Sequence, residues 1–148
     1  VDENTYIKPT KNLNNQLIDS EKILIGNSKF KTTILRMGGL IGPGRHPVYS
    51  LVNKKKILNP EGKINLIHLD DCINIIYNLI LNFPKNEIFN CVAPFHPSKK
   101  EYYSSIALDK KLKLPDFDYS KSITRTVSSK KIVNYLHYNF TRKKLLLK

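Results

Sequence analysis

The sequence predicts an α/β fold with a parallel sheet, because helical patterns alternate with short apolar strands along most of its 148 residues. Residues 13–25 have the apolar spacing of a helix, and Gly26 and Asn27 are typical of a helix end. Residues 30–37 form a β-rich run without strict alternation, as in a parallel strand that is covered on both faces. Helix, glycine turn and buried strand together make half of a βαβ unit.

The following segments continue this alternation. Residues 38–47 contain four glycines and two prolines and are predicted to form an irregular loop, followed by a short helix within residues 48–56. A strand over residues 63–69 leads into a helix that Asp70 or Asp71 caps. The remaining elements are expected as a strand over 87–92, a helix opened by a capping box at Ser98 with Tyr102, Tyr103, Ile106 and Leu108 inward, a short strand near 124–127 and a last helix over 128–136.

Composition and charge limit the classes of function. The formal net charge is +13, but lysine far outnumbers arginine and the basic residues lie in short separated groups, so solvated faces are favoured over a nucleic-acid track. A basic nucleic-acid-binding module remains an alternative that charge alone supports. The polar start predicts a cytoplasmic protein without an export signal, and the most apolar segment is too short to cross a membrane. Cys72 and Cys91 have no spacing that suggests a metal site or a disulfide framework.

The glycine-rich segment 38–47 is the strongest candidate for a ligand site. It follows a predicted parallel strand, and ligands of open α/β sheets bind outside the carboxyl ends of such strands. Glycine lets the backbone approach a ligand closely, while Arg45 and His46 can donate to a phosphate or a hydroxyl. A tight structural turn with two surface cations is the alternative.

Four blocks of sequence resemble one known superfamily, in the right order. ILRMGGLIGPGRHP is similar to the R-x-x-x-x-Y-G-P-G segment of the extended short-chain dehydrogenases, and NLIHLDDCINII to their I-H-V-D-D-V-A segment. IFNCVAPFHPSKKEYY resembles their Y-N-V segment with P-S-x-x-E, and TRTVSSKKIVNYLHYNF their closing K-x-V-S-N-x-K-L block. The resemblance covers nearly the whole chain and is greatest to the atypical, YeeZ-type branch of the NAD-dependent epimerase/dehydratase proteins.

This resemblance implies a carboxyl-terminal fragment whose amino-terminal half is missing. Residues 1–47 would be the last helix, strand and loop of an incomplete Rossmann-like domain, residues 48–140 a small α/β substrate domain, and residues 141–148 a basic tail. The family's cofactor is NAD(P), held by a G-x-x-G-x-x-G loop that this sequence lacks, so the fragment alone is expected to bind none. The implied partner is a sugar or nucleotide sugar.

The resemblance also implies roles for residues of the glycine-rich segment. The backbone at Gly38, Gly39 and Leu40 would lie near the nicotinamide end of the cofactor. Three residues would face the substrate, namely Pro43, Arg45 and His46.

The conventional chemistry of the superfamily needs a tyrosine and a lysine four residues apart on the helix before TTILR. Leu13 and Leu17 occupy those positions, or Asn12 and Gln16 in the neighbouring register, and no Tyr-x-x-x-Lys occurs anywhere in the sequence. Ile41 also replaces the tyrosine of the Y-G-P-G loop. No catalytic residue and no metal ligand is therefore assigned, and a catalytically silent binding or regulatory protein of the same fold is the second hypothesis.

Other polar residues are expected to be structural. His68 is interpreted as a packed histidine, Asp70 or Asp71 as a helix cap that can also pair with Arg36, and His96 and His137 as surface residues. For Arg36 an ion pair and a ligand contact remain open.

Overall fold

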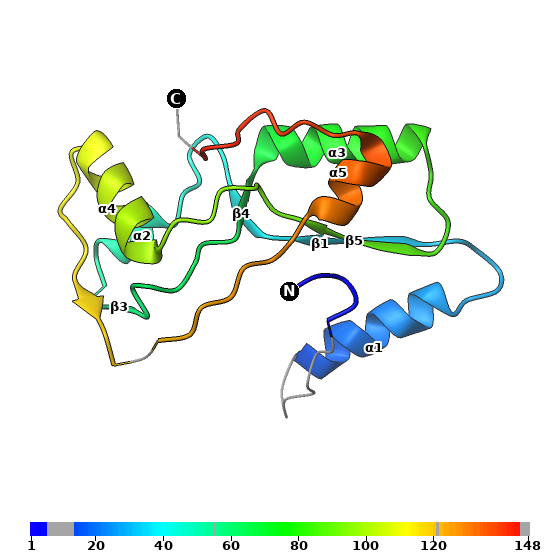
Figure 1. Ribbon diagram of the computed structural model, residues 1–148, viewed down its shortest axis with the longest axis horizontal. Helices are drawn as coiled ribbons and strands as arrows, with labels where there is room; N and C mark the ends of the chain where they lie inside the picture. The colour runs from blue at the N-terminus through cyan, green and yellow to red at the C-terminus, as the bar shows by residue number, and fades with distance from the viewer. Residues whose placement is uncertain (6–13, 55, 121, 146–148) are drawn as a thin grey trace.

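Three pairs of short parallel strands carry the fold in the computed structural model, which describes residues 1–5, 14–54, 56–120 and 122–145 (Figure 1). The pairs are β1 (Thr33–Met37) with β5 (Glu87–Cys91), β2 (Gly39–Ile41) with β4 (Leu66–His68), and β3 (Ile57–Leu58) with β6 (Phe117–Asp118). The predicted α/β class with parallel strands is therefore confirmed.

A single glycine between β1 and β2 lets the chain pass from one strand pair to the other. The Gly38 N–H donates to the Cys91 carbonyl, and the next N–H, of Gly39, donates to the Asn65 carbonyl. A Cβ atom on Gly38 would lie 2.6 Å from Val92 Cγ1 and 2.7 Å from the Asn65 oxygen. The prediction of a wholly irregular loop is wrong for β2, because close backbone approach at this glycine lets the chain pair with β4.

The helices lie on both sides of the strands. In Figure 1, α3 (Leu69–Leu81) and α1 (Asn14–Ile25) lie on opposite sides of β1 and β5. α5 (Lys130–Leu136) packs against β5, and α2 (Val48–Leu51) packs against α4 (Lys99–Asp109) at the end of the molecule that holds β3. One apolar core connects these layers, and its fully buried side chains include Phe89, Ile67, Ile75, Ile106 and Ile132.

Most long elements agree with the sequence analysis, and the differences have local causes. The capping box at Ser98 is present, since its Oγ accepts from the Glu101 N–H and its own N–H donates to the Glu101 carboxylate. Leu108 is 65% exposed, so its predicted inward position is wrong. The predicted strand near residues 124–127 is absent, because Asn65 holds this segment by accepting from the Val127 N–H and donating to the Arg125 carbonyl.

Helix α1 forms as predicted, but three of its apolar side chains are exposed within the described residues. Leu17, Ile23 and Leu24 are all more than two-fifths exposed, and Leu13 lies outside the described residues. The helix is attached to β1 by Arg36, whose Nε donates to Glu21 at 2.9 Å and whose Nη2 lies 2.5 Å from the other carboxylate oxygen. Of the two alternatives left open for Arg36, the structure shows the ion pair, and its partner is Glu21 instead of Asp70 or Asp71.

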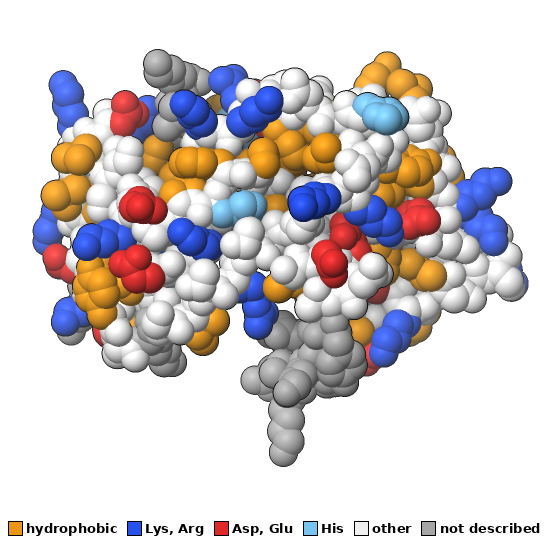
Figure 2. All heavy atoms as spheres, in the orientation of Figure 1, with side chains coloured by type: hydrophobic (Ala, Val, Ile, Leu, Met, Phe, Trp, Pro, Cys, Tyr) orange, Lys and Arg blue, Asp and Glu red, His pale blue; other side chains and the backbone are white. Residues whose placement is uncertain are grey.

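Parallel pairing joins the two parts that the sequence analysis separated at residue 47. β1 and β2 precede this residue, whereas their partners β5 and β4 follow it. The division into 1–47, 48–140 and a tail stays a prediction. No helix in the described part of the chain is long and apolar enough to cross a membrane. On the face in Figure 2, Lys and Arg side chains are spread among apolar and acidic ones.

Candidate functional site

A tight turn follows β2 at the carboxyl edge of the β2–β4 pair. The Gly42 N–H donates to the Arg45 carbonyl at 2.9 Å, and the Arg45 N–H donates back to the Gly42 carbonyl at 3.0 Å. Pro43 occupies the second position of this turn, and Gly44 has a φ of 69° in the third, as a type II turn requires. The backbone of the two glycines and the ring of Pro43 therefore lie at the carboxyl ends of the parallel strands, the edge where ligands of α/β sheets bind.

An apolar hollow lies on one side of this turn. Its volume is about 350 Å³, and it borders the start of α3. Its lining residues are Met37, Leu40, Ile41, Gly42, Pro43, Arg45, Leu69, Cys72 and Ile76. Leu40, Pro43 and Arg45 are exposed, so three of the residues predicted to contact ligand border this hollow.

A polar hollow lies on the other side of the turn and has a volume of about 310 Å³. It is lined by Gly42, Pro43, Gly44, Tyr49, His68, Asp70, Lys110 and Arg142. The turn therefore forms a shared wall between a hollow of apolar side chains and one that contains two cations, a carboxylate and an imidazole.

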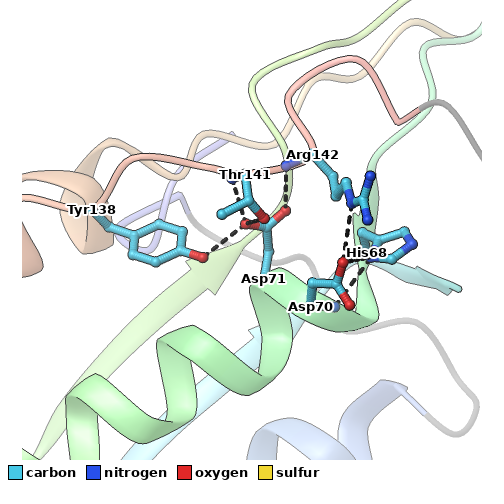
Figure 3. A network of polar contacts seen from close by, with 6 residues as sticks. All are labelled: His68, Asp70, Asp71, Tyr138, Thr141 and Arg142. Carbon is cyan, nitrogen blue, oxygen red and sulfur yellow. Dashed lines mark hydrogen bonds and ion pairs between the residues drawn. The ribbon is translucent and has the colours of Figure 1, made fainter. Parts of the chain in front are cut away.

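His68 caps helix α3 at the wall of the polar hollow. Its backbone is extended, and its Nδ1 accepts from the Asp70 N–H at 3.1 Å, which leaves the proton on Nε2 (Figure 3). The prediction that Asp70 or Asp71 caps the helix is wrong, because an imidazole nitrogen already accepts from the first turn. Although Nδ1 lies 3.4 Å from an Asp70 oxygen, an unprotonated nitrogen makes no ion pair; the cation partner of Asp70 is Arg142 Nε at 3.0 Å.

Asp71 is fully buried and fastens the end of the chain to α3. Its Oδ1 accepts from Tyr138 Oη at 2.7 Å and from the Thr141 N–H and hydroxyl at 2.8 and 2.9 Å, while Oδ2 accepts from the Arg142 N–H at 3.1 Å (Figure 3). Burial, together with this carboxylate, raises the pKa of Tyr138. We call residues 138–145 the carboxyl-terminal strap.

The strap is the part of the site that sequence reasoning missed. It carries Arg142 to the polar hollow and ends in the fully buried Leu145, whereas the sequence analysis treated residues from 141 onward as a basic tail. The one sequence signal was the Asp-Asp pair at the start of α3. Asp71 is buried there, and its partners lie about seventy residues later in the strap, which local sequence patterns do not reveal.

His46 is buried behind the turn and is committed to the protein. Its Nδ1 accepts from the Val48 N–H at 3.1 Å, so its Nε2 carries the proton and donates to Tyr102 Oη at 2.9 Å. Tyr102 in turn donates to the Leu145 carbonyl at 2.9 Å. Burial, and then Lys110, lower the pKa of His46 to about 4, so the ring is neutral at physiological pH. Both ring nitrogens of His46 therefore already have protein partners. Contact between this imidazole and a substrate stays a prediction.

The cysteines are not activated as nucleophiles. Cys72 and Cys91 are free and buried, and burial raises the pKa of Cys91 to about 12. Among the residues that the structure describes, no group of three or more metal-ligating side chains is gathered.

No protein-family model matches the sequence. Protein YeeZ of Escherichia coli (strain K12) is 33% identical over 145 residues, which cover 95% of this chain and 52% of YeeZ. The chain is a homologue of YeeZ. It spans about half the length of the curated relatives it matches, YeeZ from strain K12 and YeeZ from O157:H7.

Solved structures agree with the YeeZ relationship at the level of the fold. A UDP-glucose 4-epimerase superposes with a TM-score of 0.77 at 16% identity, over 98% of this chain and 55% of that one. MoeE5 in complex with UDP-glucose and NAD superposes with a TM-score of 0.74 at 12% identity, over 95% of this chain and 54% of that one. The resemblance of this YeeZ homologue to a carboxyl-terminal part of the NAD-dependent epimerase/dehydratases, stated from four sequence blocks, is confirmed.

Proposed function

We propose that this YeeZ homologue contributes the substrate side of an NAD(P)-dependent protein that acts on a sugar or nucleotide sugar. One observation carries the proposal: the Gly42–Pro43–Gly44 turn separates an apolar from a polar hollow at the carboxyl edge of two parallel strands. An apolar hollow suits a flat ring such as nicotinamide, whereas cations and a carboxylate suit phosphate and hydroxyl groups.

The residues before the turn would contact the cofactor by van der Waals packing. The amides of Gly38 and Gly39 already donate to carbonyl groups, so they offer close approach instead of hydrogen bonds. The Leu40 side chain is 41% exposed and would pack on the nicotinamide ring at the rim of the apolar hollow. NAD(P) would be held by a longer parent protein, because this sequence contains no G-x-x-G-x-x-G loop for the pyrophosphate.

The residues of the turn would contact the substrate. Pro43 borders both hollows, and the exposed Arg45 can reach a ligand from the rim of the apolar one. His46 would support the site indirectly, because its Nδ1 accepts from the Val48 N–H and so fixes the backbone after the turn. UDP-glucose is the reference ligand for testing these roles, because one structural neighbour is in complex with it and another is a UDP-glucose 4-epimerase.

A catalytically silent binding or regulatory protein is the second candidate. It is favoured by the absence of any Tyr-x-x-x-Lys in the sequence and by Ile41 at the position of the family's loop tyrosine. Without this pair, the usual proton transfer that accompanies hydride transfer has no donor.

Titration of the ¹⁵N-labelled chain with UDP-glucose, followed by amide NMR spectra, tests the proposal. We expect the amides of Leu40, Gly42, Gly44 and Arg45 to shift together, and NADH alone to shift few signals. Shifts confined to residues away from the turn, or none at millimolar ligand, would refute the proposed role. Mass spectrometry of the longer parent protein after incubation with UDP-glucose and NAD⁺ separates the two candidates, because only an active protein converts the sugar nucleotide.

A further inference from the structure

The polar hollow contains a buried hydrogen-bond donor, His68 Nε2–H, that none of the described residues accepts. His68 is 5% exposed and its Nδ1 is occupied by the Asp70 N–H, so its proton lies on Nε2. In the part of the chain that the structure describes, Nε2 has no hydrogen-bond partner, although His68 lines the hollow. A buried donor without a partner is costly, and a ligand acceptor in the hollow would satisfy it.

Arg142 brings a second set of free donors to the same hollow. Its Nε donates to Asp70 at 3.0 Å, while its two terminal nitrogens have no protein partner among the described residues (Figure 3). A guanidinium that is held at Nε presents its remaining N–H groups in a fixed plane, which is the geometry that binds phosphate oxygens. Lys110 lines the hollow as well and adds positive charge.

The position of Arg142 depends on Asp71. The strap reaches the hollow because this buried carboxylate accepts the Arg142 N–H and three donors from Tyr138 and Thr141. Asp70 then orients the guanidinium from the neighbouring position of the same helix turn. Asp71 thus holds the backbone of the strap, and the preceding Asp70 holds the Arg142 side chain.

We propose that the polar hollow is a diphosphate site, in which His68 Nε2–H and the Arg142 guanidinium donate to phosphate oxygens and Asp71 is the positioning residue for Arg142. The proposal rests on the proposed function for the ligand class, a nucleotide sugar, and adds the residues that recognise its phosphates. Asp70 also lines the hollow, and its Oδ1, the oxygen not bonded to Arg142, can accept from a hydroxyl of the ligand beside the diphosphate.

Calorimetric titration of the chain with inorganic pyrophosphate tests the two donors. Arg142→Gln removes the guanidinium, and His68→Asn removes the Nε2 donor while keeping a side-chain oxygen that can cap α3. Each change should weaken pyrophosphate binding by about tenfold or more, as expected for charge-assisted hydrogen bonds. Lys143→Gln makes the same charge change at the next, exposed residue of the strap and should have less than about a twofold effect. Equal losses in Lys143→Gln and Arg142→Gln would overturn the site.

The positioning role of Asp71 has its own readout. In Asp71→Asn the Arg142 Nε resonance in the NMR spectrum should move to the position of a free arginine, and pyrophosphate binding should fall as far as in Arg142→Gln. If Asp71→Asn does not fold, Tyr138→Phe removes one donor without a change of charge and should shift the same resonance by a smaller amount. A folded variant with an unmoved resonance or full affinity would overturn the role of Asp71.

The same titrations with UDP-glucose distinguish failure of this site from failure of the proposed function. Binding of pyrophosphate that depends on Arg142, without any preference for UDP-glucose, would retain the diphosphate site and remove the nucleotide-sugar proposal. Binding of UDP-glucose that is insensitive to both Arg142→Gln and His68→Asn would remove the site alone. Absence of binding to both ligands would remove both proposals.

Discussion

The buried imidazole of His46 makes the fold sensitive to acid. Its pKa is lowered to about 4 in the folded chain, below the value of 6.5 for an exposed histidine. As pH falls below 6.5 the unfolded chain takes up the proton first, so stability present at neutral pH is lost between about pH 6.5 and 4. We predict that this group lowers the free energy of unfolding by up to about 3 kcal/mol across that window, measured by urea denaturation.

A matched pair of variants isolates this effect. His46→Gln should be less stable at pH 7 but should lose much less stability on acidification, since it cannot titrate. His137→Gln changes an exposed histidine at the end of α5 and should keep the pH dependence of the unchanged chain. An equally steep pH dependence in His46→Gln would contradict the assignment.

Gly38 is expected to tolerate no side chain. In Gly38→Ala the new Cβ would lie 2.6 Å from Val92 Cγ1 and 2.7 Å from the Asn65 carbonyl oxygen, and a backbone oxygen cannot move aside easily. We predict a loss of about 1–3 kcal/mol in thermal or urea unfolding. Gly44→Asn is the control, because no atom lies within 4 Å of a Cβ at Gly44 and asparagine tolerates its φ of 69°. Equal stability of Gly38→Ala and the unchanged chain would refute the close approach.

At the scale of elements, one asparagine side chain replaces a strand partner. Asn65 Oδ1 accepts from the Val127 N–H at 2.8 Å and Nδ2 donates to the Arg125 carbonyl at 3.0 Å. Asn65→Ala should therefore speed hydrogen exchange at the Val127 amide and cost about 1–2 kcal/mol of stability. Asn78→Ala removes an exposed bond within α3 and should leave exchange at Val127 unchanged. Unaltered protection in Asn65→Ala would show that other contacts hold the segment.

Elements with local signals could be predicted from the sequence, and those with distant partners could not. The capping box at Ser98 is encoded within four residues, so it was predicted. The glycines and prolines of residues 38–47 predicted an irregular loop, and the tight turn at residues 42–44 was left only as an alternative. The strands β3 and β6 are two residues long and exist only because Ile57 pairs with Phe117, sixty positions away. The strap escaped prediction for the same reason, because its anchor Asp71 precedes it by about seventy residues.

The same distinction applies to the site. Segment 38–47 was predicted as a ligand site because glycines after a strand are visible in the sequence. Leu40, Pro43 and Arg45 border the apolar hollow, and Pro43 also borders the polar one, while ligand contact at these residues stays a prediction. His46 looked equally available, but it is buried and its Nε2 donates to Tyr102, a partner 56 residues away that only the folded chain brings to it.

At the scale of the whole molecule, the net charge of +13 is spread over separate groups of residues. The face in Figure 2 shows cations interleaved with acidic and apolar side chains. A nucleic-acid track would need a continuous basic stripe and would bind with an affinity that falls steeply as salt rises. We predict no measurable binding of a short DNA or RNA duplex at low salt in a fluorescence anisotropy titration. Tight binding that weakens with a steep salt dependence would favour the basic-module alternative.

One helix, α3, exposes apolar side chains on the side that faces away from the strands. Helix α3 buries Cys72, Ile75 and Leu79 against the strands, while Ile73 and Ile80 on its other side are 55% and 70% exposed. An exposed apolar stripe of this kind usually marks an interface. The chain with this exposed stripe spans about half the length of its curated relatives.

A crystal structure of the chain grown with UDP-glucose tests the central claim most directly. We expect the ligand to lie against the Gly42–Pro43–Gly44 turn, with phosphate oxygens within hydrogen-bond distance of His68 Nε2 and the Arg142 guanidinium. A ligand bound elsewhere, with the polar hollow holding only water while His68 and Arg142 keep their present partners, would contradict it.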